Sequence, residues 1–447
     1  MTNSIFDVII LGGGPAGYTA AERLSAAGRR VLLIERAHLG GTCLNHGCIP
    51  SKALLASAKL FAQVQMAERF GVQVGAPSFL LSGAVARKRG IVSMLRDGIG
   101  YQMSKHNVTV INGAAHITDP QTVTVDGTPF TGRTLILAAG AAPRTIDLPG
   151  AEQPHVIGVN RIMDRETLPK NLVILGGDAI AFVIASIFAL VGVRVTLVTE
   201  TDTLLPDFDP DVMTVIRNEL KQVTIHTVSR PLRIERDQVV CAEPKGEFAI
   251  PADTVVVSHG RVPHVSGYGL EQLDLDVDAH GVRTDDHMRT NLPHVYAAGD
   301  VTGRSLWAHS AIRMGEVAAN TILGIPDRYR EDLVPKVLYT YPEAAAIGLN
   351  ETEAKRRGLH VKTARLPMNA NGRFLTETEG KRGLCKLIAD ADTGRLLGVQ
   401  WVSVNASDLI ASAAAMISDE FRVRDLTQMT FPHPTMSEIL KDAALLL

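Results

Sequence analysis

The chain has 447 residues, of which 46% are hydrophobic and 21% charged, and its formal net charge is −2. This length allows several domains, and the composition is typical of a globular protein. The small net charge gives no reason to expect a nucleic acid or an anionic membrane as a partner. Because the chain has only four cysteines and its N-terminus lacks the pattern of a signal peptide, we expect a reducing, cytoplasmic location.

The N-terminal stretch FDVIILGGGPAGYTAAERLSAAGRRVLLIER predicts a strand at 8–11, a helix to about residue 27 and a second strand at 31–34. Three glycines in the pattern G-x-G-x-x-G lie between the first strand and the helix: Gly12, Gly14 and Gly17. They permit a tight turn, a close approach of the backbone to a pyrophosphate, and close packing of the helix on the strand. Glu35 ends the second strand, where a carboxylate can bind ribose hydroxyls. This unit therefore predicts a dinucleotide site.

The next stretch, GGTCLNHGCIPSKALL, contains Cys43 and Cys48 just before a predicted helix. Two thiols this close can form a small-loop disulfide if the backbone bends. In a cytosolic chain such a pair is more often catalytic than structural. We expect no metal site, because Cys241 and Cys385 each stand alone, and we expect those two thiols to be packed or on the surface.

Residues 172–193 form an apolar segment that contains a single charge, Asp178. The segment is long enough to span a membrane. The glycines at its centre favour a buried strand at 172–175, a turn and a buried helix at 179–190 instead, so we expect no membrane span. This order of strand, turn and helix repeats that of the N-terminal stretch, but of the run GGG in that stretch only two glycines remain here, Gly176 and Gly177.

Near the C-terminus, the stretch HPTMSEIL contains His433 and Glu438. An imidazole has its pKa near neutrality and can take the proton from an attacking thiol. A carboxylate on the other ring nitrogen can fix the tautomer of the imidazole. The pair is therefore a candidate general base.

Together these motifs resemble the class I pyridine-nucleotide–disulfide oxidoreductases, and most of all their dihydrolipoamide dehydrogenase branch. The cysteine motif fits that pattern at almost every position, with His46 as the main departure. The resemblance continues through HVYAAGDVTG (294–303), LYTYPEAAAIGL (338–349) and HPTMSE (433–438), and it covers essentially the whole chain.

The resemblance implies an α/β fold with two Rossmann-like nucleotide-binding domains and a C-terminal α+β dimerisation domain. We expect an FAD-binding domain at 1–147 and 271–324, an NAD-type domain at 148–270 and the dimerisation domain at 325–447. The implied active unit is a C2 homodimer, in which the His433–Glu438 dyad reaches the cysteine pair of the partner.

The resemblance also implies that FAD is the first cofactor. Its expected contacts are Gly12, Gly14, Gly17, Glu35 and Asp300. Cys48 is then the charge-transfer thiol beside the flavin, and Cys43 is the exchange thiol that faces a small dithiol or disulfide of the lipoyl type. Lys52 follows Cys48 by one helical turn and is expected to stabilise a thiolate or the reduced flavin.

The second nucleotide motif departs from the family pattern G-G-G-x-I-G-x-E. Asp178 stands where the family has a glycine that approaches the pyrophosphate, and its carboxylate is expected to repel a diphosphate. Ala181 replaces a further glycine, which is a mild change. Val183 replaces the acid that pairs, in relatives, with the lysine at the position of Lys52.

A further departure concerns the acid that binds the ribose of NAD. Counting back from the Leu-Leu-Pro run, its position maps to Thr199, although a shift of one residue brings Glu200 there instead. No arginine follows that supports binding of NADP.

Three interpretations remain. In the first, the enzyme still passes electrons to NAD⁺ through an atypical motif. In the second, NAD(H) use is lost or impaired, and electrons leave to oxygen, a quinone or a protein, as in a dithiol oxidase. In the third, the chain is a non-catalytic structural subunit, which the intact Cys43, Cys48, His433 and Glu438 disfavour. We favour the second, because the substitutions fall on positions that contact the cofactor.

Overall fold

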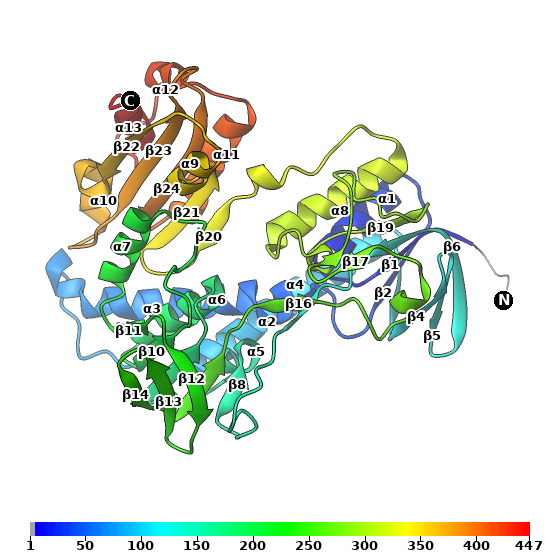
Figure 1. The fold of residues 1–447 in the computed structure, drawn as a ribbon, viewed down its shortest axis with the longest axis horizontal. Coiled ribbons are helices and arrows are strands. Elements are labelled where there is room, and N and C mark those ends of the chain that lie inside the picture. The colour runs from blue at the N-terminus through cyan, green and yellow to red at the C-terminus, as the bar shows by residue number, and fades with distance from the viewer. Residues whose placement is uncertain (1–4) are drawn as a thin grey trace. The chain divides into compact units, whose positions relative to one another are not determined.

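The computed structural model describes residues 5–447, and the chain divides into two compact units (Figure 1). The first unit contains the residues up to Ala53, together with Gly83–Arg144 and Gly260–Glu331. The second contains Leu54–Ser82, Thr145–His259 and Asp332–Leu447. The predicted FAD-binding domain contains 54–82, which lie in the second unit, and the predicted NAD-type domain contains 260–270, which lie in the first. The two units are not the three predicted domains, whose limits stay a prediction.

The first unit is built on a seven-stranded sheet of order β3-β2-β1-β6-β5-β4, with β19 also paired to β6. Its strands are β1 (Phe6–Leu11), β2 (Val31–Glu35), β3 (Thr109–Asn112), β4 (Ala115–Asp119), β5 (Thr122–Val125), β6 (Thr128–Leu137) and β19 (Val295–Ala297). Parallel pairing joins β19, β6, β1, β2 and β3, whereas β4 and β5 form antiparallel pairs. The residues of β1 are almost all buried, as expected for a parallel strand covered on both faces.

The helices of the first unit are α1 (Pro15–Ala26), α2 (Gly41–His46), α8 (Ala308–Leu323) and most of α4 (Leu81–Lys105), and the start of α3 (Cys48–Gln65) also belongs here. Of these, α1 packs on β1 and β2, and α8 packs along α1 (Figure 1). A Cβ atom at Gly315 of α8 would lie 2.4 Å from the carbonyl oxygen of Ala16 in α1, so only glycine allows this approach. Two short pairs complete the unit: β7 (Ala141–Pro143) with β16 (Arg261–Pro263), and β17 (Val277–Asp278) with β18 (Gly281–Val282).

The second unit begins with a parallel five-stranded sheet of order β11-β10-β9-β15-β8. Its strands are β8 (Val156–Gly158), β9 (Asn171–Leu175), β10 (Arg194–Val198), β11 (Val223–His226) and β15 (Thr254–Val257). The helices here are α5 (Val159–Ile162), α6 (Ala179–Leu190) and α7 (Pro210–Glu219). An antiparallel sheet of β12 (Arg230–Ile234), β13 (Gln238–Glu243) and β14 (Gly246–Pro251) follows β11.

The apolar segment at 172–193 forms β9, a turn and α6, as the glycines predicted. Every residue of α6 from Ala181 to Ala189 is buried. Across the described residues, no helix combines the length and the apolar character that crossing a bilayer requires.

The C-terminal part of the second unit is an antiparallel sheet of order β20-β21-β24-β23-β22. Its strands are β20 (Lys336–Leu338), β21 (Glu343–Gly348), β22 (Val361–Pro367), β23 (Leu384–Asp390) and β24 (Leu396–Ser403). Its helices are α9 (Glu351–Arg356), α10 (Gly372–Glu377), α11 (Ala406–Ser418), α12 (Val423–Gln428) and α13 (Ile439–Ala444). Trp401 is fully buried in the hydrophobic core of this part. The predicted fold class, two α/β nucleotide-type sheets and an α+β domain, is confirmed.

A buried ionic cluster joins this antiparallel sheet to α7. The ammonium group of Lys386, which is only 1% exposed, lies 2.8 Å from Asp209, 3.2 Å from Asp211 and 2.9 Å from Glu351.

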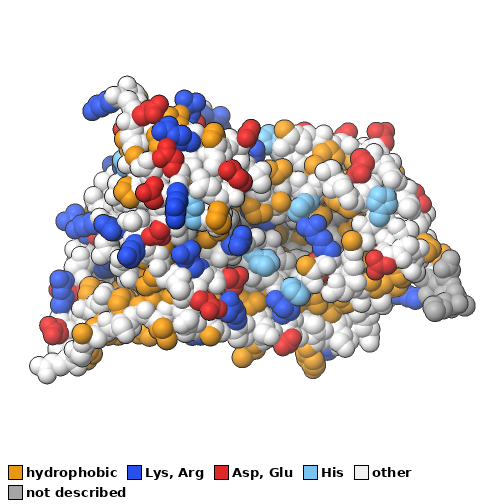
Figure 2. Space-filling view, turned by 90° about the horizontal axis from the view of Figure 1, so that it is seen from below, with side chains coloured by type: hydrophobic (Ala, Val, Ile, Leu, Met, Phe, Trp, Pro, Cys, Tyr) orange, Lys and Arg blue, Asp and Glu red, His pale blue; other side chains and the backbone are white. Residues whose placement is uncertain are grey.

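At the surface, basic and acidic side chains lie among one another on the face that Figure 2 shows. That mixture agrees with the formal net charge of −2.

Candidate active site

The first glycine turn joins β1 to α1 and leaves no room for a side chain at two of its glycines. Gly12 has φ +109°, and a Cβ atom there would lie 2.2 Å from the carbonyl oxygen of Ala138. A Cβ atom at Gly17 would lie 1.8 Å from the carbonyl oxygen of Gly12. Both positions therefore require glycine, as the G-x-G-x-x-G pattern predicted.

The N-terminus of α1 is arranged to receive an anion. Gly14 is the N-cap residue, and no side chain of the described residues caps the helix. Its first N–H groups are thus available to a ligand such as a pyrophosphate. The Glu35 carboxylate accepts hydrogen bonds from the backbone N–H of Gly13 (2.7 Å) and of Ala37 (2.8 Å), which fixes it beside the turn.

The two cysteines of the motif lie half-buried in the first unit as free thiols. Cys43 is in α2, and Cys48 is the first residue of α3, where the helix dipole favours a thiolate. The hydrogen bond that the Cys43 thiol donates lowers the pKa of Cys48 to about 7, and the charges of Lys52 and Arg261 lower it further against the effect of burial. The same hydrogen bond and burial raise the pKa of Cys43. The arrangement favours a thiolate at Cys48 and a protonated thiol at Cys43.

Two further residues near this pair, Arg261 and Tyr18, were not identified from the sequence. Asp300 forms an ion pair with Arg261, which also donates a hydrogen bond to the carbonyl oxygen of Ala141 (2.7 Å). Burial raises the pKa of the Asp300 carboxyl, and Arg261 opposes this effect. Burial and the charges of both cysteines raise the pKa of Tyr18, which lies on α1. No sequence motif identified Arg261 or Tyr18 as a neighbour of the cysteine pair.

The predicted dyad forms within the second unit. His433 Nδ1 lies 3.0 Å from Glu438 Oε2, and the imidazole is 81% exposed. Asn371, which is buried, donates from Nδ2 to the carbonyl oxygen of Thr435 (2.8 Å) and more weakly to Glu438 Oε1 (3.5 Å). Asn371 thus holds the carboxylate that orients the imidazole. It lies 67 positions before Glu438, and nothing in the sequence marked it.

The second glycine turn repeats the backbone of the first. Gly176 has φ +131°, and a Cβ atom there would lie 1.8 Å from the carbonyl oxygen of Ser258, as at Gly12. Asp178 occupies the N-cap of α6 with φ −78° and ψ 171°, close to the −75° and −175° of Gly14 at the N-cap of α1. Asp178 therefore occupies the position of Gly14.

The side chain of Asp178 caps its own helix. Its Oδ1 accepts hydrogen bonds from the backbone N–H of Ala181 (2.8 Å) and from the hydroxyl of Ser258 (2.7 Å). A carboxylate of the chain thus lies at the helix N-terminus, where α1 leaves its N–H groups to a ligand.

The strand register shows which residue matches Glu35. Leu11 pairs with Ile34 in the first sheet, and Leu175 pairs with Val198 in the second. The residue after Val198 is Thr199, so Thr199 occupies the position of Glu35 and Glu200 does not. A Cβ atom at Gly177 would lie 3.0 Å from Thr199 Oγ1, which places this hydroxyl beside the turn.

The helix after this turn is apolar where the family pattern has an acid. Val183 is 6% exposed and lies within the fully buried stretch of α6. The aliphatic side chain of valine carries no charge and forms no hydrogen bond. The position of Val183 on α6 therefore cannot supply a carboxylate to Lys52 or to any other cation.

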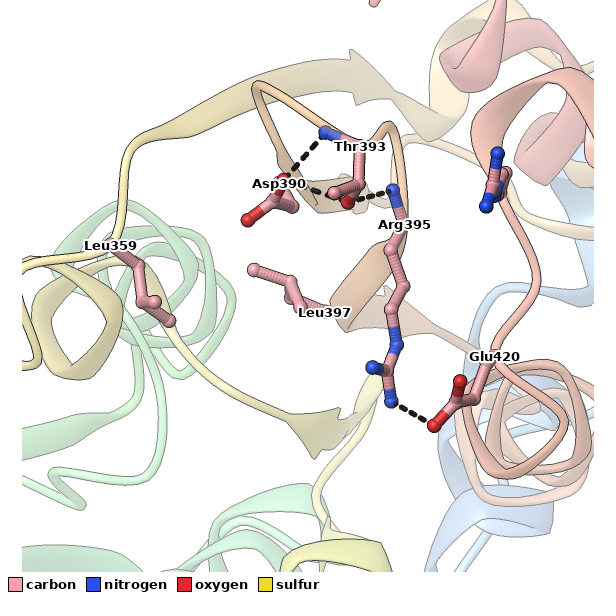
Figure 3. A pocket seen from close by; sticks show the side chains of 7 residues that line it. Leu359, Asp390, Thr393, Arg395, Leu397 and Glu420 are labelled. Carbon is pink, nitrogen blue, oxygen red and sulfur yellow. Dashed lines mark hydrogen bonds and ion pairs between the residues drawn. The ribbon is translucent and has the colours of Figure 1, made fainter.

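The other two cysteines and a surface hollow lie apart from the predicted site residues. Cys241 and Cys385 are both buried, and burial raises the pKa of each thiol. A hollow in the second unit is lined by an ion pair between Arg395 and Glu420 (2.6 Å) and by Asp390 (Figure 3). None of the predicted site residues lines this hollow.

Comparisons with known proteins match the whole architecture. The model of the family "pyridine nucleotide-disulphide oxidoreductase" matches residues 6–315, and that of the family's dimerisation domain matches residues 334–444. A Bacillus subtilis protein named dihydrolipoyl dehydrogenase is 35% identical over 98% of this chain and 97% of its own length. A protein of the same name from Thermus scotoductus is 34% identical over 98% of this chain and 96% of its own.

Solved structures agree with these sequence matches. The HOCl-induced flavoprotein disulfide reductase RclA from Escherichia coli superposes with a TM-score of 0.88 at 28% identity, covering 99% of this chain and 100% of its own. LpdA from Mycobacterium tuberculosis superposes with a TM-score of 0.90 at 26% identity, covering 99% of each chain.

We predict that Lys52→Met raises the pKa of Cys48 by about one pH unit, because it removes a nearby cation that favours the thiolate. The thiolate of the reduced protein then forms at a higher pH than in the wild type. Thiolate absorbance measured across a pH titration of the reduced protein checks this. Lys105→Met, an exposed change on α4, is the control. A wild-type titration curve for Lys52→Met contradicts the assignment.

Proposed function

The chain belongs to the pyridine nucleotide–disulphide oxidoreductase family, and we propose that it oxidises a small dithiol of the lipoyl type and passes the electrons to an acceptor other than NAD⁺. It is a flavoprotein disulfide oxidoreductase that resembles dihydrolipoyl dehydrogenase. The observation that carries the proposal is the carboxylate of Asp178 at the N-terminus of α6.

The first glycine turn fits the ADP half of FAD. Side chains are excluded at Gly12 and Gly17, the N-terminus of α1 is uncapped, and Glu35 is fixed where a ribose hydroxyl can donate to it. We propose that Asp300, paired with Arg261, contributes to the flavin side of the site. When bound, FAD supplies an acceptor for two electrons from the dithiol.

We propose that Cys43 and Cys48 alternate between a disulfide and the free thiols of this structure. A substrate thiolate attacks Cys43 Sγ, the Cys43–Cys48 bond breaks, and Cys48 leaves as a thiolate. The second substrate thiol attacks the substrate sulfur of the mixed disulfide and releases Cys43. The substrate loses two electrons and the cysteine pair gains them. The low pKa of Cys48 suits a leaving group, and the charge of Lys52 stabilises the thiolate that forms.

The proton from the attacking thiol goes to His433. Glu438 engages Nδ1, so Nε2 is the nitrogen that can accept it. The imidazole is 81% exposed within its own chain, and the matched dimerisation domain implies a homodimer. We propose that each dyad completes the site of the partner subunit, which makes the C2 homodimer the active form.

The second nucleotide unit lacks the means to bind a diphosphate. Two unit charges about 4 Å apart repel by about 4 kcal/mol at an effective dielectric constant near 20, which corresponds to roughly a thousandfold in affinity. A dinucleotide must also displace the hydrogen bonds of Asp178 to Ala181 and Ser258. Thr199 also occupies the position that corresponds to Glu35, the carboxylate proposed to bind the ribose at the first glycine turn. Oxygen, a quinone or a protein remains as the acceptor of the electrons.

The second candidate function is NAD⁺-dependent dihydrolipoyl dehydrogenase activity. The relatives of that name, 35% and 34% identical over nearly the whole chain, favour it. It requires the Asp178 side chain to leave its capping position, or the carboxylate to be protonated, when NAD⁺ binds.

We predict that dihydrolipoamide bleaches the oxidised flavin under anaerobic conditions and that added NAD⁺ does not restore its colour within seconds. Stopped-flow absorbance of the holoprotein measures both steps. The double variant Asp178→Gly and Thr199→Glu gives the second glycine turn the residues that Gly14 and Glu35 provide at the first. NADH should then bleach the flavin at least about a hundredfold faster than in the wild type.

Two further variants separate the causes in this experiment. Asp178→Asn keeps a capping side chain but removes the charge, so it tests repulsion alone. Asp202→Gly, at an exposed position after β10, is the control. Rapid reoxidation of the wild type by NAD⁺ contradicts the proposal and supports the second candidate.

We predict that His433→Gln lowers the rate of flavin bleaching by dihydrolipoamide by about 10²-fold to 10⁴-fold, because it removes the base that deprotonates the attacking thiol. His360→Gln is a matched control, since the side chain of His360 is also 81% exposed. A rise in pH, which deprotonates the substrate thiol directly, should restore part of the lost rate. An unchanged rate in His433→Gln excludes the dyad as the base.

A further inference from the structure

The turn that carries the cysteine pair is clamped by an arginine from α4. Asn45 lies between the two cysteines, and its Oδ1 accepts hydrogen bonds from Nε (3.1 Å) and Nη2 (2.7 Å) of Arg96. The two side chains lie 51 positions apart in the sequence and are partly buried. A guanidinium that donates twice to one oxygen fixes both partners in orientation.

The amide of Asn45 also holds the turn from within. Its Nδ2 donates to the carbonyl oxygens of Leu39 (3.1 Å) and Gly41 (2.9 Å). The end of α2 is therefore tied to the residues before and at its start, with Cys43 between them. Gly40 donates in turn to the carbonyl oxygen of Gly13 (2.8 Å), which connects the same residues to the first glycine turn.

A helix as short as α2 depends on such contacts. It contains six residues, too few to be stable on its own in water. A disulfide forms only when the Cα atoms lie about 4.4–6.8 Å apart and the side chains face each other. A turn that loosens at Asn45 moves Cys43 away from the geometry that closes the disulfide.

We propose that Arg96 is a positioning residue for the exchange thiol, because it holds Asn45 and thereby keeps the 43–48 turn in the form in which Cys43 meets both Cys48 and an incoming thiolate. The proposal rests on the redox role assigned above to the cysteine pair. It states that Arg96 acts through Asn45 and not through its own charge on the sulfur atoms.

A double-mutant cycle tests this with Arg96→Met, Asn45→Ala and the combined variant. Two quantities are measured: the rate at which dihydrolipoamide bleaches the flavin, and the equilibrium of the cysteine pair with glutathione redox buffers. We expect Arg96→Met to slow bleaching by about tenfold and to shift the equilibrium about tenfold toward the dithiol, because both charge-assisted hydrogen bonds of Arg96 to Asn45 are lost. Arg96→Lys, which can donate to Asn45 without the fork, should recover part of both.

The combined variant decides the mechanism. If Arg96 acts through Asn45, the combined variant matches Asn45→Ala in both measurements. Additive effects, or a wild-type equilibrium in Arg96→Met, overturn the proposal. Lys105→Met, on the same helix, controls for loss of positive charge, and thermal unfolding of each variant controls for folding. Because the glutathione equilibrium needs no dithiol substrate, it reports on Arg96 even if dihydrolipoamide fails to bleach the wild type, which would refute only the proposed function.

Discussion

The backbone N–H groups at the start of a helix need hydrogen-bond acceptors, and the two helices that follow the glycine turns, α1 and α6, differ in what can supply them. At α1, Gly14 brings no side chain, so these groups are available to a ligand. At α6, the carboxylate of Asp178 occupies the same place and is held by Ala181 and Ser258. The two turns share their glycine geometry and strand register. At the helix N-terminus, the side chain of Asp178 therefore distinguishes a turn that provides its own anion from a turn whose N–H groups are available to a phosphate.

The thiol chemistry depends on a second set of constraints in the first unit. Cys48 starts a helix and accepts a hydrogen bond from Cys43, so its thiolate is favoured near neutral pH. Under the proposed function, the electrons of the dithiol substrate enter the protein at this cysteine pair. The second glycine turn carries the Asp178 carboxylate at the N-cap of α6, and the proposal of an acceptor other than NAD⁺ rests on this difference from the first turn. The dithiol half follows the family pattern.

Local patterns predicted much of this structure, and contacts between distant residues were beyond them. The glycine turn before α1, the span of α6 and the His433–Glu438 contact all follow from residues close in sequence. The sequence also indicated Asp178 as an obstacle, but not its bond to Ser258, which lies 80 positions away. The partners Arg261, Asn371 and Arg96 were missed because each depends on how separate elements pack. No periodicity or spacing in one sequence encodes such a pairing.

The central claim is that the carboxylate of Asp178 keeps NAD⁺ from the second nucleotide unit. Isothermal titration of NAD⁺ into the oxidised holoprotein tests it most directly, because binding is measured apart from any chemical step. The account predicts a dissociation constant weaker than about 1 mM, with no saturable heat at lower concentrations. Saturable binding of one NAD⁺ per chain at about 10 μM or tighter would contradict it.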